Sequence, residues 1–399
     1  MKTFTFISQY FYPSHTSTAQ LLTDLSLNLS TSGHTILVLT STPSNSALPP
    51  VNITRTYSRF HQGHSISSKA LASLAFLLSG LGYVLRLPKS TSLLIASNPP
   101  YAGLLGLAFK YLKGGQYTFL FQDIFPESAA LSGVLKSNGL LYHFFQRLMS
   151  FICHQAKCTI VLTPAMQTYL EEKQPHLQGK LQVIENWAVE AIHPQPKAEN
   201  PFAQQHGLDK IFTVLYSGNI GRLHDIETIA EAIYLLRDQP IQFVFIGDGP
   251  KRSILTNYQE KYQLTNLVLL PFQPRQQLPH TLTACDLSLV SLIPGAEQIV
   301  APCKLYGMLA AGRAILSLST PGSYLDQLLN QHHCGINLAP GDPDRLAQTI
   351  KTLSTQTEYV ATLGHNAHQL YQQYYHIDRA AKQYEALLLG RSSPQNPSI

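Results

Sequence analysis

The sequence predicts an α/β protein built from two doubly wound domains, each with a parallel sheet that helices cover on both faces. Short, uniformly apolar segments alternate with amphipathic helical patterns along the chain, as buried parallel strands require. The alternation stops in the proline-dotted stretch NWAVEAIHPQPKAENPF (186–202) and then begins again. With 399 residues, the chain is long enough for two cores of ordinary size.

Strands of the first half are expected where short apolar runs end at polar loops. The helical pattern TAQLLTDLSLNLSTSG (18–33) lies between the first two of them and ends at Gly33, a residue that suits a helix C-terminal cap. The predicted strands of this half are 3–9, 35–40, 92–97, 117–122, 158–163 and 180–186.

The second half repeats the alternation after the proline-dotted stretch. Its predicted strands are 212–218, 242–250, 266–272, 286–292 and 314–319. We therefore predict one Rossmann-like domain over residues 1–195 and a second over residues 196–375. Residues 376–399 are expected to form a C-terminal helix, which returns to the first domain, and a polar tail.

The composition is typical of a folded protein from a reducing compartment. Charged residues make up 13% of the sequence, which excludes a disordered or nucleic-acid-binding tail composition. The five cysteines form no CxxC pair and lie in or beside apolar runs, as reduced core residues do. The N-terminal segment MKTFTFISQYFYP is too short for the apolar core of a signal peptide. We therefore expect a cytoplasmic protein.

Basic residues outweigh acidic ones in the first half of the chain. Residues 1–200 contain 14 Lys and Arg against 8 Asp and Glu, whereas residues 201–399 contain 14 against 15. No acidic residue occurs between Asp24 and Asp123. An excess of positive charge of this kind attracts anionic partners.

The uncharged stretch ALASLAFLLSGLGYVL (70–85) lies in this basic region, between Lys69 and Arg86. It is shorter than the roughly 20 residues that a membrane-spanning helix needs. Two interpretations stay open, a buried core helix and a helix that contacts an anionic membrane surface. The missing acidic residues favour the inner membrane surface, and no Arg/aromatic cluster indicates a nucleic-acid partner.

The loop after the first strand of the second half, YSGNIGRLHDIETI (216–229), combines a glycine turn with an arginine. In doubly wound sheets, ligands bind beyond the carboxyl ends of the strands. Backbone N–H groups at a helix start, with an arginine beside them, suit a phosphate. The alternative is a tight turn that serves packing alone. The candidate ligand-binding residues of this loop are Gly218, Asn219, Gly221 and Arg222.

FIGDGPKR (245–252) is a second strand-to-glycine turn in the same half. Two such turns after successive strands favour one shared anionic ligand. The candidate residues of this turn are Gly247, Asp248 and Gly249.

A third loop, IPGAEQIVAPCKLYGMLAAGRAI (293–315), places Glu297 before a predicted helix and Lys304 and Leu305 at the helix start. A carboxylate can accept hydrogen bonds from two sugar hydroxyls, and a lysine can neutralise a phosphate. The alternative is a surface loop whose Glu and Lys are solvated.

In combination, these motifs resemble the C-terminal half of glycosyltransferase family 4, in particular the branch that builds capsular, O-antigen and colanic-acid-like polysaccharides. The segments NPPYAGLLG (98–106), QDIFPESAALSGVL (122–135) and ENWAVEAIHP (185–194) resemble the N-terminal half of the same branch. The resemblance implies the GT-B fold, in which two Rossmann-like domains face each other across a cleft. It also implies a nucleotide-sugar donor held mainly by the second domain, transfer with retention at the anomeric carbon, and no metal or other cofactor.

By this resemblance, Arg222 contacts the donor diphosphate, and residues 247–250 lie near the nucleotide base. The lysine that the family usually has further along the first loop is not evident, because His224 and Asp225 stand there. Either Lys304 or Lys251 could supply the missing charge, and we favour Lys304.

Family 4 typically has two glutamates eight positions apart, the first near the transferred sugar and the second on the ribose. Glu297 resembles the first, with about two extra residues before the helix. The second falls at Gly307 and is absent. Recognition of the ribose is therefore expected to depart from the family pattern.

In the first half, Asp123 and Glu127 follow a predicted buried strand in FQDIFPE. Two carboxylates four positions apart, beside a cleft, could orient or deprotonate an acceptor hydroxyl. The alternative is a helix that starts at Pro126 with Glu127 near its positive end. The family often has a histidine or an acid at this place, and we favour Asp123. The loop 9–20 departs from the Gly-Gly pair that the family usually has next to the donor phosphates. Here Ser17 and Thr18 could donate hydroxyl hydrogen bonds instead, or simply cap the following helix.

The predicted function is that of a retaining, hexosyltransferase-type glycosyltransferase with Asp123, Glu127, Arg222 and Glu297 as catalytic residues. It would transfer a sugar from a nucleotide-sugar to a lipid-linked saccharide in cell-surface polysaccharide synthesis, as a peripheral protein of the cytoplasmic membrane face. The histidines show no HxxxH or HExxH spacing, and no metal is expected. Two alternatives remain, a nucleotide-sugar epimerase of the same architecture and a non-catalytic partner subunit.

Overall fold

The computed structural model describes residues 1–14, 16–56, 66–189 and 191–391, except for the side chains of 66–70, and the predicted polar tail (392–399) lies outside these residues. The described chain divides into two compact units. The first unit comprises Met1–Asn186, Ile299–Ala301 and the described chain from Ile377 onward, and the second comprises Trp187–Gln298 and Pro302–His376.

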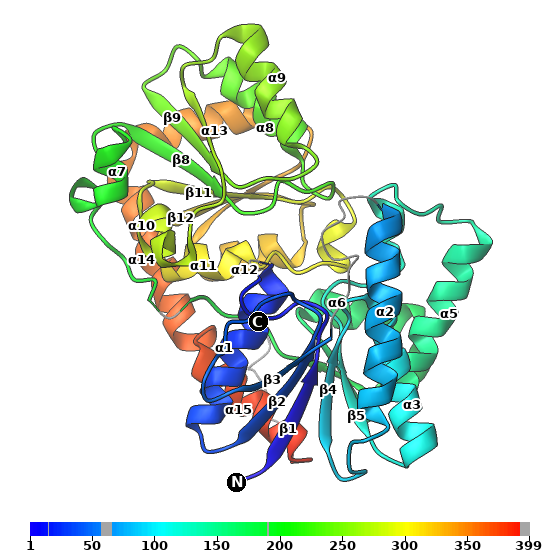
Figure 1. Ribbon diagram of the computed structural model, residues 1–399. Helices are drawn as coiled ribbons and strands as arrows, with labels where there is room; N and C mark the ends of the chain where they lie inside the picture. Colours follow the sequence, from blue (N-terminus) through cyan, green and yellow to red (C-terminus); the bar gives the residue numbers. More distant parts are fainter. Residues whose placement is uncertain (15, 57–65, 190, 392–399) are drawn as a thin grey trace. The chain divides into compact units, whose positions relative to one another are not determined.

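The first unit is built on a parallel sheet of seven strands in the order β3-β2-β1-β4-β5-β6-β7 (Figure 1). Its central strands bury side chains on both faces, which explains their uniformly apolar sequences. The order reverses between β1 and β4, the place where doubly wound sheets bind ligands. The strands are β1 (Thr3–Ile7), β2 (Thr35–Thr40), β3 (Asn52–Arg55), β4 (Ser92–Ala96), β5 (Tyr117–Leu120), β6 (Cys158–Val161) and β7 (Leu181–Val183).

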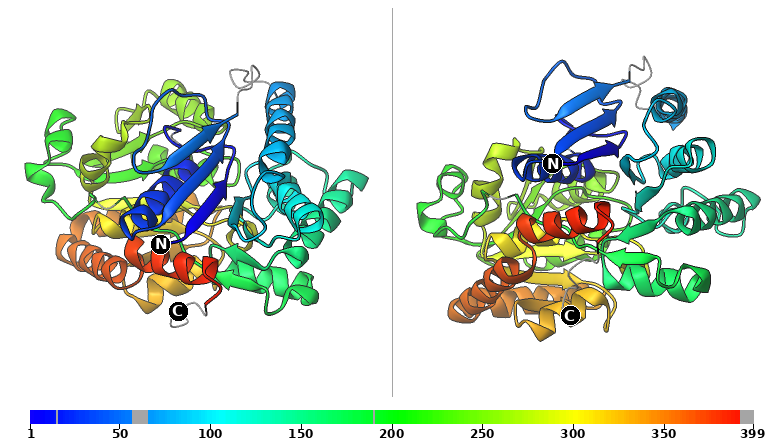
Figure 2. Two further views of the ribbon diagram at one scale, coloured as in Figure 1. Left: turned by 60° about the horizontal axis from the view of Figure 1, so that its bottom comes forward. Right: turned by 90° about the horizontal axis from the view of Figure 1, so that it is seen from below.

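Helices cover both faces of this sheet. α1 and α15 lie side by side, and α2, α3 and α5 form a second row of neighbours (Figures 1 and 2). The two rows take opposite faces because the crossovers are right-handed and lead toward opposite edges of the sheet. The helices are α1 (Ser17–Thr31), α2 (Ile66–Val84), α3 (Gly103–Lys113), α4 (Glu127–Leu131), α5 (Leu140–Gln155), α6 (Pro164–Lys173) and α15 (Ile377–Leu388).

The second unit is built on a parallel sheet of six strands in the order β10-β9-β8-β11-β12-β13. β8 and β11 are neighbours at the reversal of strand order, so the loops after β8, β9 and β11 emerge at one edge of the sheet. The strands are β8 (Phe212–Ser217), β9 (Ile241–Ile246), β10 (Leu267–Leu270), β11 (Leu287–Ser291), β12 (Ala314–Leu318) and β13 (Gly335–Leu338).

The helices of the second unit pack in two groups. α8 contacts α9 and α13, and α11 contacts α14. Val214, Tyr216 and Phe243 lie in the core that the first group covers. The helices are α7 (Pro201–Gln205), α8 (Ile226–Leu235), α9 (Arg252–Tyr262), α10 (Leu278–Thr283), α11 (Lys304–Ala310), α12 (Tyr324–Gln331), α13 (Pro343–Thr355) and α14 (Thr357–Tyr374).

The predicted fold class is confirmed, because the chain forms two parallel, Rossmann-like sheets with helices. Every predicted strand is present, although several are shorter than expected. The helix predicted over 18–33 is α1, and Gly33 follows its end with a φ of +88°. The five cysteines are free. β3 and β13 were not predicted, since β3 (NITR) is a half-polar edge strand and β13 (GINL) has only four residues.

The stretch 70–85 forms most of α2. Phe76 and Val84 are buried, so the core interpretation holds for one face of the helix. Leu74 and Leu78 are exposed on the rest of its surface. In the part of the chain that the structure describes, no helix is long and apolar enough to cross a membrane.

Candidate functional site

The turns after β8 and β9 pack directly against each other in the second unit. A Cβ atom on Gly247 would lie 2.1 Å from the carbonyl oxygen of Gly218, and one on Gly249 would lie 2.4 Å from that of Ile220. Both glycines also have positive φ angles, of +138° and +155°. Only glycine fits at these two positions, because backbone meets backbone there.

Most N–H groups of the two turns are used within the fold. Gly218 donates to the carbonyl of Ile246, Gly221 to the Nδ1 atom of His224, and Gly249 to the Asp248 carboxylate. The N–H of Gly247 likewise goes to a strand carbonyl. These four glycines therefore shape the turns and do not themselves offer N–H groups to a ligand in this structure.

Asn219 and Arg222 retain donors for a ligand. Both residues are exposed, and their backbone N–H groups have no acceptor among the residues that the structure describes. The Arg222 guanidinium likewise has no carboxylate partner in the described chain. Exposed amides beside an unpaired guanidinium are suited to an anion.

Lys304, at the start of α11, lies over this turn. Its ammonium is 3.5 Å from the ring centroid of Tyr216 and 3.3 Å from the carbonyl oxygen of Asn219. Burial lowers the pKa of the Lys304 ammonium. A cation over an aromatic face is attracted to it, so Tyr216 fixes the position of this charge beside Gly218 and Asn219.

Glu297 lies in the short helix η6 (Ala296–Gln298), after β11. It is only 5% exposed, and its Oε1 atom accepts the N–H of Thr320 at 2.8 Å. No cation in the described residues pairs with its carboxylate. A buried carboxylate with a single hydrogen bond is costly, and hydroxyl donors of a bound ligand would offset that cost.

Two residues of α11 have packing roles. Leu305 is fully buried, and its N–H is donated to the carbonyl of Pro302, so its side chain belongs to the core and its amide is occupied. At Gly307, a Cβ atom would already lie 3.0 Å from Leu282 Cδ1. A side chain at this position would therefore require Leu282 to shift.

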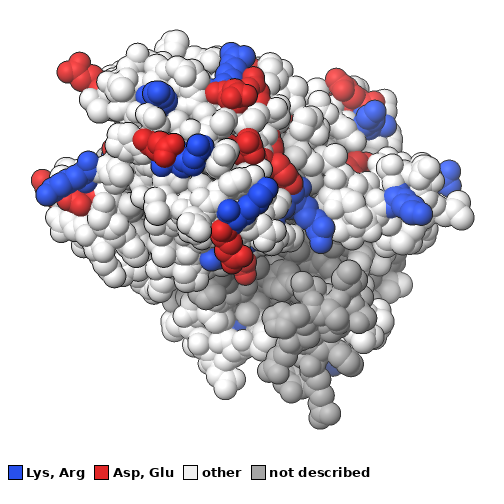
Figure 3. All heavy atoms as spheres, turned by 90° about the horizontal axis from the view of Figure 1, so that it is seen from above, with Lys and Arg blue, Asp and Glu red and all other residues white. Residues whose placement is uncertain are grey.

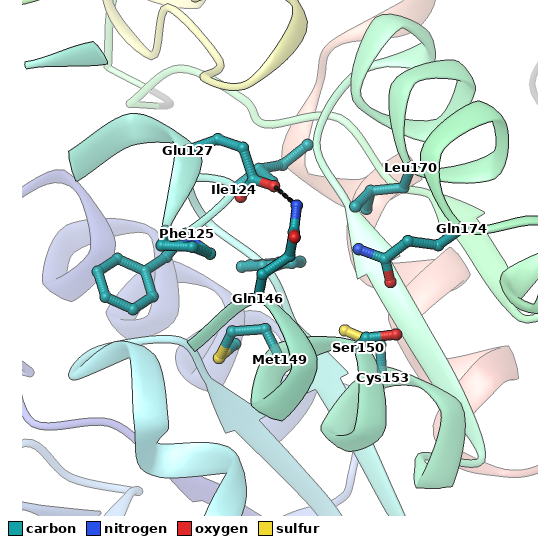
Figure 4. A pocket seen from close by; sticks show the side chains of 11 residues that line it. Ile124, Phe125, Glu127, Gln146, Met149, Ser150, Cys153, Leu170 and Gln174 are labelled. Atoms are coloured by element: carbon teal, nitrogen blue, oxygen red, sulfur yellow. Dashed lines mark hydrogen bonds between the residues drawn. The ribbon is translucent and has the colours of Figure 1, made fainter. Parts of the chain in front are cut away.

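In the first unit, Asp123 and Glu127 have different surroundings. Asp123 follows β5, forms a bridge with Val300 and is exposed, yet the desolvation caused by surrounding protein atoms raises its pKa to about 6. Glu127 is buried at the start of α4, and its carboxylate accepts a hydrogen bond of 3.3 Å from Gln146 of α5 (Figure 4). The two carboxylates are therefore not equivalent, and only Asp123 reaches solvent.

Glu127 faces a narrow pocket between α4, α5 and α6 (Figure 4). The pocket is lined mainly by apolar side chains, among them Ile124, Met149 and Leu170. Glu127 also interacts with the Tyr142 hydroxyl, whose pKa it raises after the larger effect of burial. These contacts give Glu127 a role in holding α4 against α5.

The start of α1 contains both predicted hydroxyl residues. Thr16 is its N-terminal cap, accepting the N–H of Ala19. Thr18 is buried and its hydroxyl accepts a hydrogen bond from Asn98, whereas Ser17 is exposed. His15, in the same loop, lies outside the described residues. Ser17 is thus the hydroxyl of this pair that a ligand can reach.

Residues 211–356, which contain this set of turns, match the model of the family Glycosyl transferases group 1. The chain is also 30% identical over 286 residues to WbjE of Pseudomonas aeruginosa, named as a glycosyltransferase, and the match covers 71% of each protein. The chain belongs to the group 1 glycosyltransferases. This glycosyltransferase is also 37% identical over 99 residues, about a quarter of each chain, to WcaI of Escherichia coli K12, named as a colanic acid biosynthesis glycosyl transferase.

Solved structures share the fold of the whole glycosyltransferase chain. Sucrose-phosphate synthase from Thermosynechococcus elongatus superposes with a TM-score of 0.80 at 16% identity, covering 98% of this chain and 99% of its own. HepE of Anabaena, solved in complex with UDP and glucose, superposes with a TM-score of 0.75 at 16% identity, covering 98% and 100%. The predicted GT-B fold and the glycosyltransferase resemblance are thereby confirmed.

No group of three or more metal-ligating side chains occurs in the described part of this glycosyltransferase. On the face shown in Figure 3, acidic and basic side chains are interspersed. His224, which the sequence indicated only as a residue in place of the family's lysine, accepts the Gly221 N–H with its ring. Its position between Arg222 and the α8 cap Asp225 was the available signal.

Proposed function

We propose that this glycosyltransferase transfers a sugar, with retention, from a nucleotide-sugar to a lipid-linked saccharide in cell-surface polysaccharide synthesis. The supporting observation is the convergence of two cations and one buried carboxylate on adjacent strand ends of the second unit. Arg222 follows β8, Glu297 follows β11, and Lys304 lies over the β8 turn. The UDP and glucose bound to HepE and the name of WcaI support the donor and the pathway.

The cations serve the departing nucleoside diphosphate. As the bond between sugar and phosphate breaks, negative charge grows on the phosphate oxygens, and preorganised donors stabilise that charge. Arg222, Lys304 and the N–H groups of Asn219 and Arg222 supply these donors without a metal ion. The leaving phosphate then helps to deprotonate the acceptor hydroxyl on the same face of the sugar.

Glu297 and Asp123 have separate roles in this proposal. Glu297 accepts hydrogen bonds from sugar hydroxyls through the carboxylate oxygen that Thr320 leaves free. Asp123, in its ionised form, orients the acceptor hydroxyl or takes its proton. Ser17 has an exposed hydroxyl that can donate to a phosphate oxygen.

The acceptor is proposed to be presented by an anionic inner membrane surface. Exposed apolar side chains occur on three helices of which α3 contacts the other two. They are Leu74 and Leu78 of α2, Leu112 of α3 and Phe144 of α5. Basic residues accompany them, and no acidic residue lies between Asp24 and Asp123. Apolar side chains with lysines and arginines around them suit an anionic lipid surface.

Flotation with vesicles tests the membrane part of the proposal. Vesicles of phosphatidylglycerol and phosphatidylethanolamine are expected to carry the protein, and vesicles of phosphatidylcholine alone are not. Leu74→Ser with Leu78→Ser should weaken the binding several-fold, whereas Tyr359→Ser, an exposed aromatic of the second unit, should not. Equal flotation of both variants would contradict a membrane surface at α2.

A panel of UDP-, GDP-, ADP- and dTDP-sugars tests the donor. Binding of the cognate nucleotide-sugar at a hundredfold excess over Kd should stabilise the protein by about 2.7 kcal/mol. Incubation with the donor alone distinguishes the alternatives: a transferase gives at most slow hydrolysis, whereas an epimerase gives an isomerised nucleotide-sugar. Binding without turnover across a broad acceptor set would indicate a non-catalytic partner subunit.

A further inference from the structure

The turn that binds Glu297 connects β12 to α12 in the second unit. The backbone N–H of Thr320 donates to the Oε1 atom of Glu297 at 2.8 Å. Pro321 and Gly322 follow, and the N–H of Ser323 donates to the Thr320 carbonyl at 3.0 Å. A proline followed by a glycine with a φ of +79° is typical of a type II turn. The position of this turn therefore determines where the buried Glu297 carboxylate points.

Asn337, in the edge strand β13, binds the residue before this turn. Its Nδ2 atom donates to the carbonyl oxygen of Ser319 at 3.1 Å, and its Oδ1 atom accepts a hydrogen bond of 2.7 Å from the Ser319 hydroxyl. The hydroxyl of Ser317, its partner across the sheet, donates to the same oxygen. A carbonyl can only accept, so the amide nitrogen must face Ser319 and the side chain has one orientation. The whole Asn337 amide is therefore used to hold the end of β12.

The network continues from Ser319 to the start of α12. Ser319 gives its hydroxyl proton to Asn337, so Ser323 is the donor in the 2.8 Å contact between the hydroxyls of Ser319 and Ser323. Ser323 is also the N-terminal cap of α12, where its hydroxyl accepts the N–H of Asp326. The turn is thus fixed at both ends, by Asn337 before it and by the α12 cap after it.

Asn337 is an unusual residue for its place in a strand. Asparagine is depleted in strands, and the next residue, Leu338, points to the opposite face and into the core. Ser317 and Ser319 are fully buried. Buried polar groups that bond to one another make a structure rigid and specific, and here the part made rigid is the turn that binds Glu297. The sequence analysis did not single out Asn337, because β13 was not predicted.

We propose that Asn337 is a positioning residue for the transferred sugar and acts through the turn and Glu297. It fixes Thr320, whose N–H holds one carboxylate oxygen, so that the other oxygen of Glu297 is presented to the sugar hydroxyls. This inference rests on the proposed function, in which Glu297 accepts hydrogen bonds from those hydroxyls. Loosening the turn then weakens binding of the nucleotide-sugar and leaves binding of the nucleoside diphosphate, which has no such sugar, unchanged.

Two variants loosen the turn to different degrees. Asn337→Leu removes the amide and keeps a side chain of nearly the same shape. Ser319→Ala is milder, since the bond from Asn337 Nδ2 to the Ser319 carbonyl stays in place, and it decides the question if Asn337→Leu does not fold. Gln259→Met is the matched control. The Gln259 amide donates to the carbonyl of Leu267 at 2.7 Å in β10, the other edge strand of the same sheet.

Calorimetric titration of the full chain compares UDP with UDP-glucose, UDP-galactose and UDP-N-acetylglucosamine, or with the GDP, ADP and dTDP forms if UDP does not bind. For the nucleotide-sugar that wild type binds most tightly, we expect Asn337→Leu to raise the Kd about fivefold to tenfold and Ser319→Ala about threefold. The Kd of the nucleoside diphosphate should change by less than about twofold in both variants. Gln259→Met should leave both constants unchanged.

A double-mutant cycle with Glu297→Ala tests whether Asn337 acts through the carboxylate. Glu297→Ala should raise the Kd of the nucleotide-sugar about tenfold or more. Asn337→Leu added to it should change that Kd by less than about twofold, because the group that Asn337 positions is then absent.

Three results would overturn the inference. They are an equal rise in the Kd of the nucleoside diphosphate and of the nucleotide-sugar, no rise in either, and a full effect of Asn337→Leu in the Glu297→Ala background. If wild type binds none of these nucleotides, the proposed function fails instead, and the two failures are thereby distinguished.

Discussion

The Nζ atom of Lys251 lies 2.8 Å from the Glu227 carboxylate and 2.8 Å from the carbonyl oxygen of His224. This ion pair decides between the two lysines that the sequence left as candidates for the missing loop charge. Lys251 is committed to α8 and to the backbone of the turn, whereas among the described residues Lys304 has a carbonyl and an aromatic face as its partners. Lys304 is thus the lysine with charge to offer a ligand.

We predict that Lys304→Ala lowers kcat/KM about tenfold to hundredfold, the loss expected for one hydrogen bond to a charged group. Lys251→Ala removes an ion pair at the surface of α8 and should lower kcat/KM by less than about threefold. Steady-state kinetics with the cognate donor measures both. A larger loss in Lys251→Ala than in Lys304→Ala would reverse the assignment.

Arg222→Ala should lower turnover by about 10²–10³-fold, by analogy with the loss of one preorganised donor to a developing oxyanion. Arg237→Ala is the matched control, since Arg237 lies on the ring of Tyr234 beside Asp238 at the end of α8. It should leave turnover unchanged. Wild-type turnover in Arg222→Ala would refute the contact between Arg222 and the diphosphate.

Glu297→Gln tests the buried carboxylate without removing its structural bond. The glutamine oxygen can still accept the Thr320 N–H, and the substitution removes a buried charge that no cation in the described chain compensates. We therefore expect an unchanged or higher Tm together with a kcat about tenfold to hundredfold lower. A lower Tm with unchanged kcat would make Glu297 a purely structural residue.

The sequence predicted the sheets well because buried parallel strands are uniformly apolar, and this signal is local. β3 and β13 were not predicted. An edge strand such as NITR has no apolar run, and a strand of four residues is too short to show an alternation of apolar and polar residues. The sequence therefore predicts a strand where both faces of that strand are buried, because every residue of such a strand is then apolar.

The candidate site was predicted less completely, because it depends on which groups pair with each other in three dimensions. The sequence located the turns of Gly218 and Gly247, but it could not show that their N–H groups are donated within the fold. Likewise, Leu305 follows Lys304 directly, yet helix geometry turns it into the core. Hydrogen-bond partners of this kind depend on the register of neighbouring strands, which no single segment encodes.

The packing of the two glycine turns predicts a strong effect of a single methyl group. Gly247→Ala would place Cβ 2.1 Å from the Gly218 carbonyl at a φ of +138°, and should destabilise the fold by about 3 kcal/mol or more from strain and overpacking. Gly341→Ala has a positive φ of +84° but open space around Cβ, and should cost about 1 kcal/mol. Thermal unfolding compares the two, and equal shifts in Tm would show that the turns do not pack as described.

Asp123 gives the protein a predicted pH dependence, because desolvation raises the pKa of its carboxyl to about 6. The protonated form is favoured in the folded state, so its contribution to stability is complete below the unfolded pKa of about 3.9 and is lost as the pH rises through about 6. Asp123→Asn, which is neutral at every pH, should therefore have a higher Tm than wild type at pH 8 and the same Tm near pH 4.

The same group should affect activity in the opposite direction. If ionised Asp123 orients or deprotonates the acceptor hydroxyl, kcat/KM of the wild type falls below about pH 6. The residual activity of Asp123→Asn should be low and should lack this acidic limb. Asp286→Asn, which changes a carboxylate paired with Lys197 in the second unit, should retain the limb. A limb that persists in Asp123→Asn would assign the titration to another group and leave Asp123 without a catalytic role.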